Sequence, residues 1–230
     1  MNGARTIVGR GYTRCRYGQL HYLQGLPDAS TPRRPTLILL HQNPSSSMEY
    51  EPLLREMCQD RQVIAFDTPG YGMSDRPPAP LSISDYAAAF SDGIDALQLT
   101  GPLDAFGFHT GTLLTIELAL RRPDSVARVA LSGIPMRTPE ERAERLSKVR
   151  ATPGPTEDGA GILATSTALW NFVVTQRDPR LSLDRAVDLY AEKNRTLHRG
   201  WWAYDGVWSY DYERLRRLHQ PTLIVQPQEP

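Results

Sequence analysis

The stretch Gly107-Phe108-His109-Thr110-Gly111 decides the fold of this chain. The residues before it, 103–106, form a short apolar run typical of a buried strand, and residues 112–120 carry apolar side chains at helical spacing. The five residues therefore span a junction of strand, tight turn and helix. A glycine stands on each side of the central Phe-His-Thr, as expected where side chains would collide with the neighbouring strand and helix.

Short apolar runs and helical patterns alternate on both sides of this junction. Strands are predicted at residues 19–24, 36–40, 63–66, 103–106 and 126–131. Helices are predicted at residues 47–57, at 112–120, and from a cap at Ser82 to about residue 97. This alternation is typical of an α/β fold, in which helices cover both faces of a mostly parallel sheet.

The alternation stops after residue 135. Residues 136–218 predict a helical insertion that is charged at first, broken at 151–155 and rich in aromatic residues from 201 to 212. A strand pattern returns at 222–225. We therefore expect an α/β core over residues 1–135, a helical cap over 136–218 and a return to the core over 219–230. A further strand and helix are expected to be missing, which would leave a sheet edge at 222–225 free to form a homodimer.

The composition narrows the classes of partner. The 230 residues contain 26 basic and 26 acidic side chains, so the chain carries no electrostatic signature of binding to nucleic acid or to an anionic membrane. The first 16 residues lack the apolar centre of a secretion signal, and no run approaches the ~20 apolar residues of a membrane span. We expect a cytoplasmic protein whose partner is a small molecule.

Cysteine and histidine usage predicts neither a disulfide nor a metal site. Cys15 and Cys58 lie in unrelated segments, and the five histidines are scattered without the spacing of metal ligands. The sequence therefore predicts neither a metal nor any other cofactor.

Three motifs occur in the order and spacing of the α/β-hydrolase fold family, which the chain resembles over nearly its whole length. Leu-His-Gln-Asn-Pro at 40–44 resembles the family's H-G-x-P loop, with glutamine in place of glycine. Residues 66–74 are similar to its D-x-P-G-x-G-x-S turn. The stretch at 107–111 resembles its nucleophile elbow, with histidine where serine, cysteine or aspartate normally stands.

The resemblance implies a hydrolase that acts on a small, apolar, ester-like substrate. It assigns His109 to the position of the nucleophile, and the backbone amides of Asn43 and Thr110 to the oxyanion hole. The side chains expected to line the substrate pocket are Gln42, Phe108, Trp202 and Trp208.

The chain is not expected to belong to the haloalkane dehalogenase subfamily. Haloalkane dehalogenases carry a similar H-G-N-P loop, whose asparagine side chain holds the leaving halide, but their elbow carries aspartate followed by tryptophan. His109 and Thr110 occupy those two positions here.

A standard catalytic triad cannot be assembled from these residues. The family's acid usually follows the strand that matches 222–225, where Glu229 is the candidate, and its histidine comes later still. His41, Asp67 and Ser74 are interpreted as structural residues of their two loops.

Three hypotheses for the function stay open. In the first, the chain is an enzyme of this superfamily in which His109 acts as nucleophile or as general base. This hypothesis includes a cofactor-independent lyase, cyclase or isomerase that uses His109 as its base. In the second, the chain is a non-catalytic relative that only binds a ligand. In the third, it is a truncated product.

Overall fold

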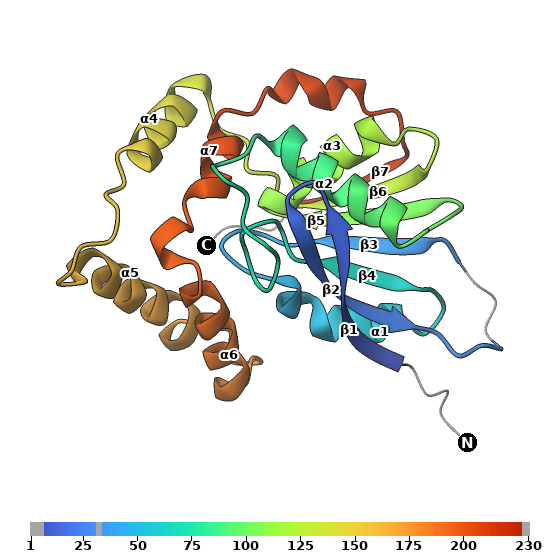
Figure 1. The fold of residues 1–230 in the computed structure, drawn as a ribbon, viewed down its shortest axis with the longest axis horizontal. Coiled ribbons are helices and arrows are strands. Elements are labelled where there is room, and N and C mark those ends of the chain that lie inside the picture. Colours follow the sequence, from blue (N-terminus) through green and yellow to red (C-terminus); the bar gives the residue numbers. More distant parts are fainter. Residues whose placement is uncertain (1–6, 31–33, 227–230) are drawn as a thin grey trace.

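A computed structural model describes residues 7–30 and 34–226 of the chain. Within these residues, seven strands form one sheet in the order β1-β2-β4-β3-β5-β6-β7 (Figure 1). The strands are β1 (Ile7–Cys15), β2 (Gly18–Leu26), β3 (Thr36–Leu40), β4 (Val63–Phe66), β5 (Leu103–Phe108), β6 (Val126–Ser132) and β7 (Thr222–Val225). β2 runs antiparallel to β1 and β4, and the remaining pairs are parallel. The predicted α/β fold with a mostly parallel sheet is confirmed.

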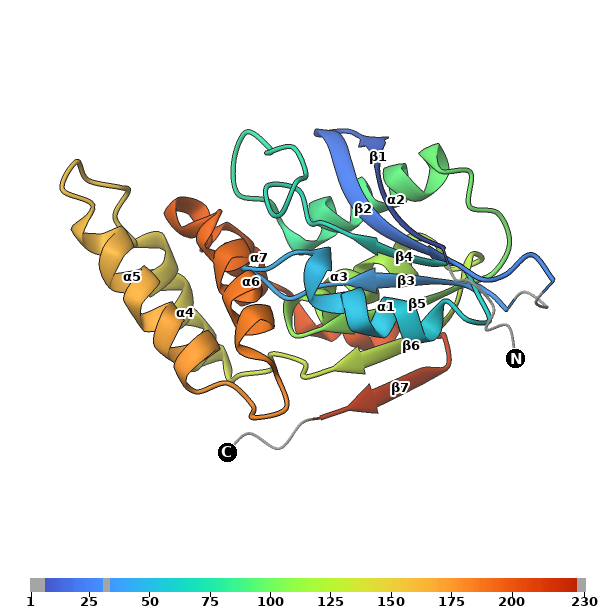
Figure 2. The same cartoon turned by 90° about the horizontal axis from the view of Figure 1, so that it is seen from below.

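Helices cover both faces of this sheet. Figures 1 and 2 show α1 (Glu51–Met57) on one face and α2 (Ile83–Ala96) and α3 (Thr110–Arg121) on the other. The short helix η1 (Ser47–Tyr50) precedes α1, and Ser46 caps it by accepting a hydrogen bond from the Met48 N–H. Ser82 caps α2 in the same way. Each face of the sheet packs its own cluster of buried apolar side chains against these helices.

The central strands owe their burial to this double cover. Every residue of β4 is buried, and so are four of the five residues of β3. In the parallel register of β3 and β5, Leu40 pairs with Gly107. The loop after β3 and the turn after β5 therefore leave the same edge of the sheet as neighbours.

One strand was not predicted. Residues 1–16 were interpreted only as a polar N-terminal stretch, yet residues 7–15 form β1, which pairs along its whole length with β2. The strand lies at the end of the sheet, and Arg10 and Arg14 are exposed on it. An edge strand with one face in solvent needs few apolar residues, which explains why hydrophobicity did not reveal it.

A helical segment connects β6 to β7 and projects beyond the carboxyl edge of the parallel strands (Figure 2). Its elements are α4 (Pro139–Arg150), α5 (Ala160–Trp170), the π-helical turn η2 (Asn171–Thr175), α6 (Leu183–Asn194), η3 (Leu197–Arg199), α7 (Trp202–Trp208) and η4 (Tyr212–Arg217). α4 and α5 lie wholly within the described residues and contain no buried side chain. α7 instead buries Ala203 and Val207 against the core. The role of this segment as a cap stays a prediction.

β7 lies at the end of the sheet next to β6, with Leu223, Ile224 and Val225 exposed. An exposed apolar edge strand of this kind is a surface on which a second strand can pair. The homodimer predicted from this edge stays a prediction.

The approach of α3 to the sheet depends on two glycines. A Cβ atom on Gly107 would lie 2.0 Å from the carbonyl oxygen of Gly111, and one on Gly111 would lie 1.9 Å from the carbonyl oxygen of Leu40. Both neighbours are backbone atoms, which cannot turn away as a side chain can. Replacing either glycine would push the helix away from β3 and β5.

We therefore expect Gly111→Ala to lower the free energy of unfolding by about 3 kcal/mol, the upper end of the range for overpacking. Urea denaturation followed by circular dichroism measures this loss. Gly161→Ala in α5 is the matched control, because no atom lies within 4 Å of its added Cβ. Equal stability of the two variants would contradict the close approach of α3.

Candidate functional site

The turn between β5 and α3 holds His109 in an uncommon backbone conformation. Its φ is 50° and its ψ is −114°, a region that residues other than glycine rarely adopt. The His109 N–H donates to the Ser132 carbonyl at 2.9 Å, and the His109 carbonyl accepts from the N–H and the hydroxyl of Thr112, at 2.9 and 2.6 Å. These bonds on both sides hold the strained residue in place.

Thr110 is the first residue of α3 and is fully buried. The first N–H groups of a helix have no partner inside the helix, and they carry the positive end of its dipole. The amide of Thr110 is one of these groups. The start of α3 thus provides backbone donors directly beside His109, suited to an oxygen that gains negative charge.

Asn43 lies in the loop after β3, beside this turn. Its side chain is 1% exposed, and its amide nitrogen and oxygen form no hydrogen bond to any described residue. Burying such a polar group without a partner costs roughly 1–3 kcal/mol. The side-chain amide of Asn43 is therefore an enclosed polar group without a described partner at this edge of the sheet.

The loop that carries Asn43 is held from outside by the helical segment. Tyr204 of α7 donates its hydroxyl to the Asn43 carbonyl, and Lys193 of α6 donates to the Pro44 carbonyl at 2.8 Å. Arg185 of α6 donates to the carbonyl of Met48. Burial raises the pKa of Tyr204 to about 12, so it stays a hydroxyl donor at neutral pH. Burial also lowers the pKa of Lys193.

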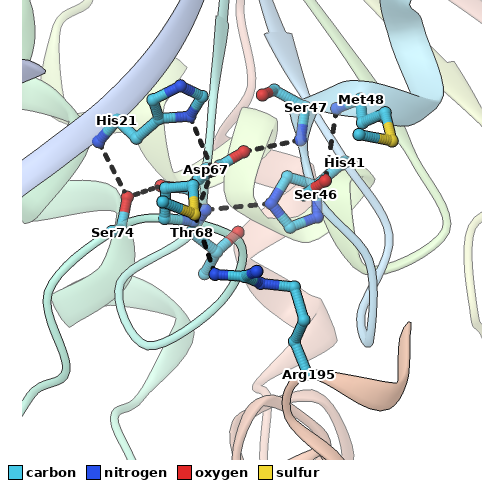
Figure 3. Close-up of polar contacts among 10 residues, drawn as sticks. His21, His41, Ser46, Ser47, Met48, Asp67, Thr68, Ser74 and Arg195 are labelled. Atoms are coloured by element: carbon cyan, nitrogen blue, oxygen red, sulfur yellow. Dashed lines mark hydrogen bonds and ion pairs between the residues drawn. The ribbon is translucent and has the colours of Figure 1, made fainter. Parts of the chain in front are cut away.

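His41 connects this loop to the turn after β4. Its Nε2 accepts a hydrogen bond from the Thr68 N–H at 2.9 Å (Figure 3), and its Nδ1 lies 2.6 Å from the Gln42 carbonyl. The Thr68 N–H can only donate, so Nε2 is the acceptor. The Gln42 carbonyl can only accept, so Nδ1 carries the proton. Both ring nitrogens are thus used within the protein, which agrees with the structural interpretation of His41.

Asp67 organises the turn after β4. Its carboxylate accepts from the N–H of Ser47 at 2.6 Å, from the N–H of Met73 at 2.8 Å and from Nδ1 of His21 at 2.8 Å (Figure 3). The hydroxyl of Ser74 donates to the Asp67 carbonyl at 2.9 Å. Burial raises the pKa of Asp67, but these bonds and the nearby histidines outweigh it and lower the pKa overall. Asp67 is therefore a carboxylate at neutral pH.

The other residues predicted to bind substrate contact neighbouring side chains. Both the N–H and the side-chain amide of Gln42 donate to Glu49, at 3.1 and 3.2 Å. The Phe108 ring meets the His109 ring edge-on, with 6.4 Å between their centroids. The two tryptophans lie in α7, where Trp202 meets Trp201 edge-on and Trp208 stacks on Tyr204. Their role in binding substrate stays a prediction. Glu229 lies outside the described residues.

The described residues contain no group of three or more histidine, cysteine or acidic side chains that could hold a metal ion. Cys15 and Cys58, both in this part of the chain, are not joined by a disulfide. None of the helices in residues 7–30 and 34–226 is long and apolar enough to cross a membrane.

The sequence and the fold of the chain match those of a known family. The family model of the α/β hydrolase fold matches residues 35–226. The chain belongs to this family. Among solved structures, a hydrolase from Pseudomonas aeruginosa is similar with a TM-score of 0.73 and 19% identity, over 94% of this chain and 79% of the other. An epoxide hydrolase from an endophytic Streptomyces gives 0.75 and 19%, over 95% and 79%.

Two curated relatives have similar sequences. An (E)-2-((N-methylformamido)methylene)succinate hydrolase of Acinetobacter baylyi is 29% identical over 116 residues, half of this α/β-hydrolase chain. A haloalkane dehalogenase of Mesorhizobium japonicum is 32% identical over 96 residues, 42% of the chain. The matches span only 44% and 31% of these relatives' own lengths.

Sequence reasoning missed three residues that position the loops. His21 was treated only as one of five scattered histidines, Tyr204 only as part of the aromatic stretch at 201–212, and Lys193 was not considered for the site. The antiparallel register in which Tyr22 pairs with Phe66 sets His21 beside Asp67. Knowledge of that strand register would have indicated that His21 contacts Asp67. Lys193 and Tyr204 reach the loop from about 150 residues away in sequence, and no local pattern reports such a contact.

Asp67 gives a stability prediction with a defined pH range. Because the pKa of Asp67 is lowered from its ordinary value of 3.8, its stabilisation is fully present above that value and is lost as the pH falls through the lower, folded-state pKa. Asp67→Asn should lower the free energy of unfolding by about 3 kcal/mol at neutral pH, because a neutral amide is a poorer partner for three donors.

Urea titrations of both proteins from neutral pH down to about the ordinary carboxyl pKa and below measure this difference, which should shrink with acid. The exposed Asp124 supplies the control substitution Asp124→Asn, expected to be nearly neutral. A difference that stays constant across this range would show that the Asp67 charge contributes nothing.

Proposed function

We propose that the chain hydrolyses a small, largely apolar, activated ester, with His109 as the nucleophile and the amides of Asn43 and Thr110 as the oxyanion hole. The observation that carries this proposal is the strained backbone of His109 at the start of α3. A strained residue costs of order 1–3 kcal/mol and persists where the surrounding structure holds it, most often at functional sites. The names of the relatives support hydrolysis as the class of reaction.

An imidazole can perform this reaction without a standard triad. A neutral imidazole already carries a nucleophilic lone pair, whereas a serine hydroxyl needs a base to remove its proton first. In the first step an imidazole nitrogen of His109 bonds to the carbonyl carbon, the bond to the leaving oxygen breaks, and the alcohol or phenol departs with the proton that the imidazole loses. Water then attacks the acyl-imidazole, which releases the carboxylic acid and restores the imidazole.

The two amides would stabilise the charge that develops on the carbonyl oxygen. The Thr110 amide opens α3, and the Asn43 loop leaves the neighbouring strand at the same edge of the sheet. Donors of this kind are each worth about a hundredfold or more in rate, because they act in a buried site.

The helical segment would complete the site. Tyr204 and Lys193 hold the backbone of the Asn43 loop from the side away from the sheet. We propose that this segment covers the elbow, and that Phe108 and Trp202 contribute apolar surface to the substrate pocket. Such a pocket with few polar groups suits a small apolar acyl chain.

His109→Ala should reduce the hydrolysis of p-nitrophenyl acetate at least about a hundredfold, because the acyl group loses its acceptor. Release of p-nitrophenolate is followed by absorbance, with circular dichroism to check folding. His198→Ala, at the exposed histidine of η3, is the matched control and should keep its rate.

Water labelled with heavy oxygen separates this function from its alternatives. Hydrolysis puts the label into the released acid, whereas a lyase or isomerase that used His109 as a base would not. Saturable binding without product would instead identify a ligand-binding protein. An unchanged rate in His109→Ala would reject the histidine as nucleophile.

A further inference from the structure

A cavity lies at the end of α3 that is farthest from His109. Its volume is about 850 Å³, within the usual range for small ligands. Its walls come from the start of α2, the second half of α3, the start of β6 and the segment from η4 to residue 220, which runs past α3 in red in Figure 1. At about 1.5 Å per residue, the end of α3 at Arg121 lies roughly 16 Å along the helix from Thr110. The cavity is therefore distinct from the site proposed for hydrolysis.

The lining carries an excess of positive charge. Among the described residues that form it are four arginines and one carboxylate, that of Glu117. Glu117 is 2% exposed, and it accepts from the Tyr210 hydroxyl at 2.8 Å and from Nη2 of Arg214 at 2.7 Å. Arg216 is paired with Glu213, which lies outside the lining. Two of the four arginines therefore have a counter-charge, and two do not.

The two remaining arginines of the lining are Arg121 and Arg217, and both are exposed. Neither forms an ion pair with any described residue. The acids of the neighbouring segments do not neutralise them, because Asp92 in α2 is paired with Arg16 and the exposed Asp124 lies outside the lining. An anionic ligand would supply the missing counter-charge.

The contact between Glu117 and Arg214 brings these two arginines into one part of the cavity. Arg121 follows Glu117 by one turn of α3, which separates their Cβ atoms by about 6 Å. Arg217 follows Arg214 by three residues in the 3₁₀ helix η4, where side chains three residues apart eclipse one another. Both free arginines thus begin one turn away from the same buried ion pair. A group with several anionic oxygens can accept from both.

The charge of the ligand follows from these two guanidinium groups, and its body from the rest of the wall. A phosphate monoester carries a charge of about −1.5 to −2 at pH 7 and three strong acceptor oxygens, whereas a carboxylate carries one charge. Arginine binds phosphate in a planar, two-bond geometry. Leu120, Pro123 and Val126 add an apolar part to the same wall, which suits an organic group attached to the phosphate.

We propose that this cavity binds a small organic phosphate monoester, whose phosphate is held by Arg121 and Arg217 and whose organic group contacts the apolar wall. The site does not depend on His109 or on hydrolysis. Because Arg121 belongs to α3 and Arg217 to η4, the bound phosphate would join the end of α3 to the segment that leads into β7.

Phenyl phosphate is the probe, with two matched compounds. Benzoate keeps the ring and carries a single charge, and inorganic phosphate keeps the charge and lacks the ring. Titration calorimetry at neutral pH and low salt should show saturable binding of phenyl phosphate. Each matched compound should bind about tenfold more weakly or worse, because benzoate loses an ion pair and inorganic phosphate loses the apolar contact.

Arg217→Met is the decisive variant, because Arg217 is exposed and its loss should not disturb folding, which circular dichroism checks. It should weaken phenyl phosphate about tenfold, and Arg121→Met should do the same. Arg180→Met, at an exposed arginine between η2 and α6, is the matched control and should leave the affinity unchanged.

His109→Ala should also bind phenyl phosphate normally, whatever its effect on ester hydrolysis. Absence of saturable binding, equal binding of either matched compound, an unchanged affinity in Arg217→Met, or loss of binding in His109→Ala would each overturn the proposal.

Discussion

The close approach of α3 to the sheet is the constraint on which the rest of this structure depends. It leaves no room for a side chain at Gly107 or Gly111, where an added Cβ would lie within 2.0 Å of backbone oxygen. Because the helix starts so tightly after β5, the residue between strand and helix must take a positive φ, and it is His109. The same packing brings the first amides of α3 beside the loop after β3. The position of the imidazole and the direction of the helix dipole are therefore consequences of one packing contact.

Asp67 has a comparable role at the neighbouring turn, but through hydrogen bonds. A single buried carboxylate joins three segments, namely β2 through His21, η1 through Ser47 and its own turn through Met73. Gly72 belongs to this arrangement, because a Cβ on it would lie 2.1 Å from the Asp67 carboxylate. An ionised acid with several donors is well satisfied when buried, whereas any one of these donors alone would be costly to leave unpaired. The charge of Asp67 thus fixes the loop that carries Asn43 from the core side, while Tyr204 and Lys193 fix it from the helical segment.

Local pattern was enough to predict the parallel core. β3 and β4 are buried on both faces, so each is a continuous apolar run that can be recognised in the sequence. Ser82 caps the start of α2, as its residue type predicts. β1 was not predicted, because an edge strand with one face in solvent needs no apolar run. The contacts of the site escaped for a different reason. The contact between His21 and Asp67 depends on strand register, and the contact between Lys193 and Pro44 depends on the path of a long insertion. Local sequence patterns determine neither.

The energetics of residue 109 bear on why a histidine stands there. Glycine would adopt a φ of 50° without strain, so a chain with no use for a side chain at this turn would be more stable with glycine. The backbone strain at His109 therefore costs about 1–3 kcal/mol of stability, in a turn that places an imidazole beside the first amides of α3. That arrangement suits a group that must gain and lose a bond to an electrophile, because the donors stabilise the charge on the partner atom while the ring itself needs no second base.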